Sequence, residues 1–117
     1  MKYTYTLTGR GWITCTVEIN GHEIEMRASY LSDALYDFLS ALIRINKYSG
    51  VQHAEFAEEP GAYRWIFERH DNLINIQILW FADTLAQEPD ENGIVQFNQW
   101  CYLYDFNAGV LQGIEEL

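Results

Sequence analysis

His53 and Glu55 come closer than other residue pairs in this chain to the types and spacing of a chemical site. They lie two positions apart in a stretch that reads as a β-strand, so both side chains would share one face of a sheet. An imidazole and a carboxylate placed in this way could bind a metal ion or exchange a proton. A metal site needs at least a third ligand, and the sequence places none beside them. We therefore expect no catalytic residue, metal ion or cofactor here.

The other reactive residue types lack neighbours that would activate them. Glu58 and Glu59 form a carboxylate pair, but they occupy a predicted turn, whereas a general acid needs a pocket that raises its pKa. Cys15 and Cys101 are the only two cysteines, and their isolation is typical of buried, reduced thiols. The sequence also has no GxSxG, Walker, GxGxxG, HExxH or paired CxxC motif. These observations predict a protein that is not an enzyme.

The composition is strongly acidic. Seventeen acidic residues against seven basic ones give a formal net charge of −10. Such a surface repels phosphate groups, which argues against nucleic acid and anionic membranes as partners, and it favours a basic protein partner. Solubility alone is the alternative explanation of the acidity. The acids expected to steer a basic partner lie in the predicted turn and in a predicted loop at residues 82–93: Glu58, Glu59, Asp83, Glu88, Asp90 and Glu91.

One amphipathic helix is expected to organise the elements that carry these residues. Residues 29–47 repeat apolar side chains at helical spacing, and Ser29 or Ser32 could cap the start of the helix. An apolar stripe of this kind must pack against another element. Because nearly everything around it reads as β-strand, we expect one face of an antiparallel sheet to cover it.

The strands around this helix are delimited by turn residues. Residues 2–28 read as a long hairpin with Asn20-Gly21 at the turn, which pairs Cys15 with Met26 and Glu18 with Glu23. Residues 9–11, Gly-Arg-Gly, would interrupt its first strand with a bulge or bend. Further strands are expected at residues 51–56, 63–69, 74–81 and 94–104, and a short final helix, capped by Asp105, at residues 106–115.

These elements predict a single α+β domain over residues 1–117. Its core would be a six-stranded, mainly antiparallel sheet in the chain order ββαββββα, with both helices packed on the sheet. The sequence starts without a signal-like segment and contains no run of about 18 apolar residues that could span a bilayer. We therefore expect a cytoplasmic protein.

Large aromatic residues are predicted on the sheet face that points away from the long helix. Strand alternation places Trp100 and Tyr102 there, and protein interfaces are enriched in such side chains. Alternatively, the final helix or the first strand covers this face and makes it a second small core. Three further residues have the same outward parity: Trp12, Ile66 and Leu79.

The run SYLSDALYDFLSALIRI followed by EFAEEPGAYRWIFER resembles a pattern in small, uncharacterised bacterial proteins, in which an SDAL-type helix precedes an EEPGxYRW hairpin. Acidic single-domain proteins of this kind are similar in character to immunity proteins of contact-dependent inhibition and other polymorphic toxin systems. This resemblance implies a protein that neutralises a toxin by binding it.

Three functional hypotheses follow. The first is an immunity protein that binds a basic toxin domain, with the acids as steering charges and Trp100 and Tyr102 as anchors. The second is a homodimeric structural or adaptor domain joined through the same aromatic face. The third is an enzyme or small-ligand module, which would need a concave pocket between sheet and helix.

Overall fold

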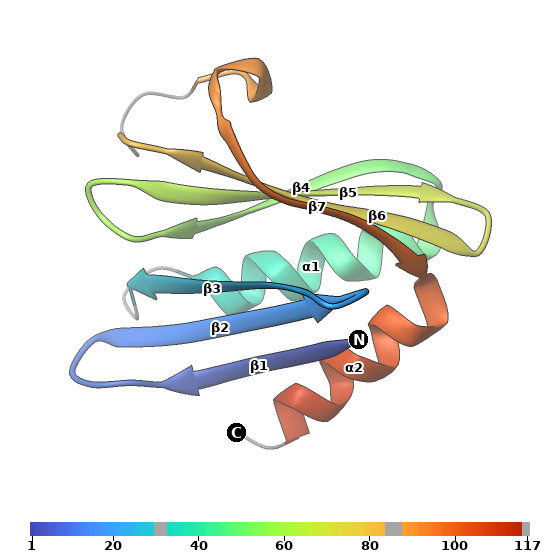
Figure 1. Cartoon of the computed structure of the whole chain (residues 1–117), viewed down its shortest axis with the longest axis horizontal. Coiled ribbons are helices and arrows are strands. Elements are labelled where there is room, and N and C mark those ends of the chain that lie inside the picture. Colours follow the sequence, from blue (N-terminus) through green and yellow to red (C-terminus); the bar gives the residue numbers. More distant parts are fainter. Residues whose placement is uncertain (30–32, 84–87, 116–117) are drawn as a thin grey trace.

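The computed structural model describes residues 1–29, 33–83 and 88–115. Strands and helices follow one another along the chain in an α+β arrangement (Figure 1). In order, the elements are β1 (Lys2–Leu7), β2 (Trp12–Ile19), β3 (His22–Ser29), α1 (Ala34–Lys47), β4 (Gly50–Ala57), β5 (Ala62–His70), β6 (Leu73–Phe81), a 3-10 turn η1 (Asp90–Asn92), β7 (Ile94–Tyr102) and α2 (Leu103–Glu115).

The strands of the described residues form two antiparallel sheets. One has the order β1-β2-β3 and the other the order β4-β5-β6-β7. The α+β class and the chain order are confirmed, but the single six-stranded sheet is wrong. Gly9 and Gly11 adopt φ angles of 109° and 77°, so the expected bend is a full reversal that folds β1 back onto β2. The first expected strand is therefore two strands, and α1 separates two meanders.

The strand registers within the predicted hairpins agree with the structure. Asn20 and Gly21 both have positive φ, as a type I′ turn requires, and β2 pairs Cys15 with Met26. The turn residues determine these registers locally, so no long-range information is needed to predict them.

Helix α1 lies between the two sheets and joins them into one core (Figure 1). Its Phe38 is fully buried, and the ring centroid lies 5.0 Å from that of Tyr3 in β1 and 4.8 Å from that of Trp65 in β5. Asp33 precedes the helix, which starts later than expected because Ser29 ends β3. The other expected cap, Ser32, lies outside the described residues.

Helix α2 packs along β1. It begins at Leu103 directly after β7, and the Leu103 amide donates to the Asn72 carbonyl at 2.8 Å. Asp105 lies in the first turn, so its predicted role as N-cap is wrong. A side chain at Gly113 would overlap the backbone of Tyr3, so this glycine permits the close approach of α2 to β1. Among the described residues, no helix has the length and apolar character needed to cross a membrane.

Candidate functional site

The outer face of the four-stranded sheet carries the predicted aromatic anchors. Both described helices lie on the other side of this sheet (Figure 1), and α2 packs on β1 instead of covering the face. Trp100 is 44% exposed and Tyr102 is 58% exposed. The covered alternative, a second small core under the final helix, therefore does not hold for these two residues.

The other residues of outward parity are placed differently. Leu79 is only 2% exposed, because the loop that follows β6 returns over it: a side chain at Gly93 would contact both Leu79 and Phe81. Ile66 is half-buried. Trp12 belongs to the three-stranded sheet, where the Arg27 guanidinium lies 4.7 Å from its ring centroid. The predicted patch thus narrows to Trp100 and Tyr102.

These two aromatics form what we call the aromatic end of the sheet, together with His70 and Leu73. The rings of His70 and Trp100 are 5.6 Å apart between centroids, and Leu73 is the cross-strand partner of Tyr102. Behind them, the Asn20 side-chain amide donates to the Trp100 carbonyl at 3.0 Å. The turn between β2 and β3 therefore supports the strand that carries the anchors.

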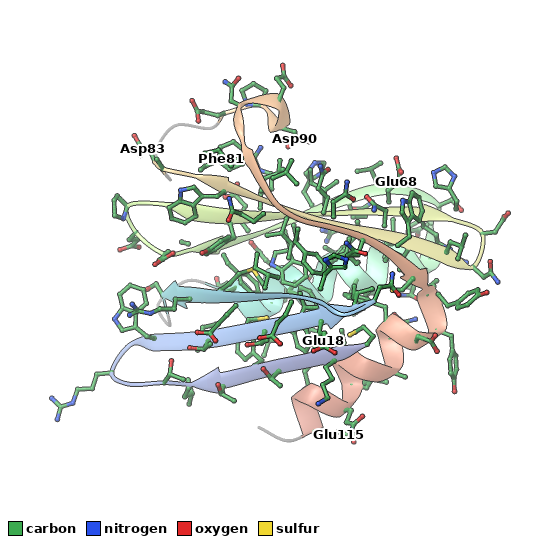
Figure 2. The ribbon with its side chains drawn as sticks, viewed as in Figure 1. Glu18, Glu68, Phe81, Asp83, Asp90 and Glu115 are labelled. Atoms are coloured by element: carbon green, nitrogen blue, oxygen red, sulfur yellow. The ribbon has the colours of Figure 1, made fainter. Side chains whose placement is uncertain are left out.

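The predicted acids gather at the opposite end of the same sheet. The β4–β5 turn and the segment after β6 meet there, because Ala62 pairs with Phe81. Figure 2 shows Asp83 and Asp90 at this end, with Glu68 toward the aromatic end. We call this the acidic end; its members are Glu58, Glu59, Asp83, Glu88, Asp90 and Glu91.

The structure therefore does not unite the predicted site residues in one patch. β7 has nine residues, so its two ends lie roughly 25 Å apart at about 3.3 Å per residue. The acidic end lies at the start of β7 and the aromatic end at its finish. A partner that contacts both must span the outer face of the sheet.

A cluster around Arg64 fixes the acidic end to the sheet. The Arg64 Nη1 donates to Asp90 Oδ1 at 2.9 Å and to the Glu88 carbonyl at 2.8 Å, and Nε donates to Glu55 Oε1 at 3.1 Å. The guanidinium also lies 4.2 Å from the ring centroid of Phe81. Arg64 thus binds two carboxylates and the backbone of the loop at once.

His53 completes this cluster, and the arrangement explains the His53 and Glu55 pair. His53 Nε2 lies 3.1 Å from Asp90 Oδ2, while Glu55 pairs with Arg64. Both side chains therefore hold partners within the chain. Among the described residues, no group of three His, Cys, Asp or Glu side chains is placed to hold a metal ion.

The electrostatics of the cluster follow from these contacts. Desolvation acts against ionisation of Asp90, but hydrogen bonds from His53 and Arg64 outweigh it and lower the pKa of Asp90. Nearby, desolvation and the charges of Asp33 and Glu55 raise the pKa of Asp37. A hollow of about 370 Å³ lies between these side chains. It is lined by Asp37 and by Glu55 and Asp90, and the contacts of the last two with Arg64 hold the segment at Asp90 against the sheet.

Sequence reasoning missed Arg64 as the centre of the cluster. The turn after β4 places Arg64 opposite Glu55 in the register of β4 and β5. The contact between these two residues could therefore have been predicted from the hairpin. Asp90 reaches Arg64 from a loop 26 positions away, and strand alternation carries no information about such a contact.

The two cysteines are free and poorly suited to nucleophilic chemistry. Cys15 is buried, as predicted, and burial raises the pKa of its thiol to about 12. Cys101 is only half-buried; desolvation and the charge of Asp105 raise its pKa to about 11. Both thiols are therefore protonated near neutral pH.

Comparison with known proteins gives no family assignment. No family model, no curated protein and no solved structure matches the chain.

Proposed function

We propose that this chain is a non-enzymatic binding protein of the immunity type, which neutralises a basic toxin domain by binding it directly. The observation that carries the binding role is the outer face of the four-stranded sheet, which exposes Trp100 and Tyr102 while α1 and α2 lie on the other side. Exposed aromatics of this size are the residues that anchor protein interfaces. The immunity role rests on the acidic charge and on the resemblance in class.

The two ends of the face have separate tasks in this proposal. The acidic end raises the rate of encounter with a basic surface, because long-range attraction acts before contact. Arg64 and His53 already compensate Asp90, so Glu58, Glu59 and Glu91 supply steering charge. Trp100 and Tyr102 then bury their rings and slow dissociation. Because the ends lie roughly 25 Å apart, the expected partner is a folded domain.

The first experiment is affinity capture from the native host's lysate at low salt and again at about 0.5 M salt, where the Debye length is below about 5 Å. We expect one basic protein to bind at low salt and to bind less at high salt. Capture of no protein other than this chain would contradict the proposal.

With the captured partner, one can test whether the position of the acidic residues on the surface determines the association rate. The triple variant Glu58→Gln, Glu59→Gln, Glu91→Gln should slow association by about tenfold at low salt and flatten its salt dependence. The matched control, Glu18→Gln, Glu23→Gln, Glu25→Gln, removes the same charge from the three-stranded sheet and should change the rate far less. Equal effects would mean that only net charge matters.

The anchors are tested through dissociation. Tyr102→Ser should raise the dissociation rate by tenfold or more, on the order of 1.4 kcal/mol. The control is Tyr36→Ser, because Tyr36 is an exposed tyrosine of α1, away from the proposed face. An unchanged dissociation rate in Tyr102→Ser would exclude the aromatic end from the interface.

A further inference from the structure

An apolar groove runs between α1 and α2, on elements that the proposed function does not use. The two helices run in opposite directions along it, since Asn46 lies beside Asn107 at one end and Leu39 and Ile114 line the other. The paired amides of Asn46 and Asn107, 2.7 and 3.1 Å apart, hold the helices together. The groove encloses about 480 Å³ and is lined by Leu39, Leu42, Ile43, Asn46, Lys47, Asn107, Val110, Leu111 and Ile114.

The walls of the groove expose large aliphatic side chains. Ile43 of α1 is 56% exposed and Leu111 of α2 is 60% exposed, while Leu42 and Val110 are buried at its floor. A protruding side chain therefore stands on each wall beside a shallow apolar hole. Burying such a surface against another apolar surface is favourable, because it removes apolar area from water.

We propose that a second copy of this chain docks on the α1–α2 groove and forms a symmetric dimer. A two-fold interface brings the same surface of both copies together, so that surface must be complementary to itself. Ile43 and Leu111 meet this requirement, because the exposed apolar wall of each helix can pack against the same wall of the other copy. A ligand confined to the groove floor would leave both side chains exposed.

The charges around the groove favour a second copy in one orientation. Lys47 is the one charged residue among those that line it, and it lies at the Asn46 and Asn107 end. Glu115 ends α2 at the opposite end (Figure 2). A two-fold axis perpendicular to the helices reverses the second copy and brings Lys47 of each copy toward Glu115 of the other. The acidic end of the four-stranded sheet stays away from this contact.

The size of the helical face sets the expected affinity. Helices of 14 and 13 residues are each about 20 Å long, so the face measures roughly 20 by 20 Å. Two such faces bury roughly 800 Å² in total, which is below the standard size of a specific interface, so we expect a weak dimer with a dissociation constant on the order of tens of micromolar. The outer face of the four-stranded sheet points elsewhere (Figure 1), so the dimer leaves both aromatic ends free.

The test is sedimentation velocity of the full chain from about 1 µM to about 1 mM. We expect a concentration-dependent dimer whose dissociation constant rises at least about tenfold in Ile43→Gln, Leu111→Gln, with an unchanged circular dichroism spectrum. The matched control, Trp100→Gln, Tyr102→Gln, changes two exposed residues of the sheet face and should leave dimerisation unchanged. Lys47→Glu should weaken the dimer, and Lys47→Glu combined with Glu115→Lys should restore it.

Two outcomes would overturn this proposal. A monomer at every concentration would show that the groove does not join two copies. A dimer that persists in Ile43→Gln, Leu111→Gln but is lost in Trp100→Gln, Tyr102→Gln would place the contact on the aromatic end.

Discussion

Arg64 determines where the acidic end lies. Its guanidinium contacts Glu55 on β4, Asp90 in η1, the Glu88 carbonyl and the ring of Phe81. The side chain is only 14% exposed, so these bonds form in a partly desolvated place where hydrogen bonds between charged groups are strong. The loop after β6 is thereby attached to the sheet at this point.

The contribution of Asp90 to stability should depend on pH in a defined direction. The pKa of Asp90 is lowered in the folded chain, so its carboxylate stabilises the fold above its unfolded pKa of about 3.9. This contribution is lost as the pH falls through the lowered pKa. Asp90→Asn removes the charge and keeps an acceptor, so it should lower the free energy of unfolding at neutral pH by about 1 kcal/mol or less, because the side chain is 44% exposed.

The free energy of unfolding of the unchanged chain and of Asp90→Asn is measured by urea unfolding from about pH 3 to about pH 7. The difference between them should shrink steadily below about pH 4. Glu91→Gln is the matched control, since Glu91 is exposed and adjacent in the chain. A difference for Asp90→Asn that is constant over the whole range would show that the ion pair does not stabilise the fold.

At the scale of elements, α1 fills the space between the two sheets. Phe38 contacts aromatic rings from β1, β4, β5 and α2 within centroid distances of 4.8 to 6.4 Å. Each sheet alone would expose one apolar face. The helix therefore covers part of these faces, and β3 contacts β4 and β7 of the other sheet directly.

Replacing Phe38 should be among the most destabilising single changes in the chain. Phe38→Ala leaves a cavity that several rings border, and we expect it to lower the free energy of unfolding by about 3 to 5 kcal/mol. Tyr36→Ala removes an exposed aromatic from the same helix and should change it by less than about 0.5 kcal/mol. Chemical unfolding measures both values. A cost below about 1 kcal/mol for Phe38→Ala would contradict the central position of α1.

Sequence reasoning succeeded where short-range chemistry determines the structure. The positive φ angles at Asn20 and Gly21 fix the β2–β3 register, and the periodicity of residues 29–47 predicts a helix of which Ala34–Lys47 forms α1. It failed where contacts between distant segments decide. The division into two sheets depends on where β1 packs after the turn at Gly9 and Gly11, and η1 reaches Arg64 across the sheet.

The candidate site divides in the same way. Alternation along β7 placed Trp100 and Tyr102 on the outer face, and both are exposed. The sequence could not show that the acids gather at the other end, because that depends on which ends of β4, β5 and β6 meet. The sequence also could not show that Leu79 is buried, because Leu79 is covered by the segment at Gly93, which is distant from it in the chain.

At the scale of the whole molecule, the two sheets share one core. Buried residues of β1–β3, α1, β4–β7 and α2 belong to a single cluster. Neither sheet has a second apolar layer of its own, so loss of one removes the cover of the other. We therefore expect the two sheets to unfold together.

A single cooperative transition is the expected result of chemical unfolding. Far-ultraviolet circular dichroism and tryptophan fluorescence should give the same midpoint and the same slope, because Trp65 reports on the shared core and the dichroism reports on both sheets. Two separated midpoints would mean that the sheets are independent units.

The meander order of both sheets has a consequence for the kinetics of folding. Every strand of the described residues pairs only with a strand adjacent to it in the sequence. Bringing such strands together closes only short loops and costs little chain entropy. The contact order is therefore low for a protein rich in β-structure. During synthesis the β1–β3 meander emerges first, and its apolar face has no cover until α1 and the second meander follow. Because α2 follows β7 and packs along β1, docking of the last helix onto the first strand is the step that completes the native state.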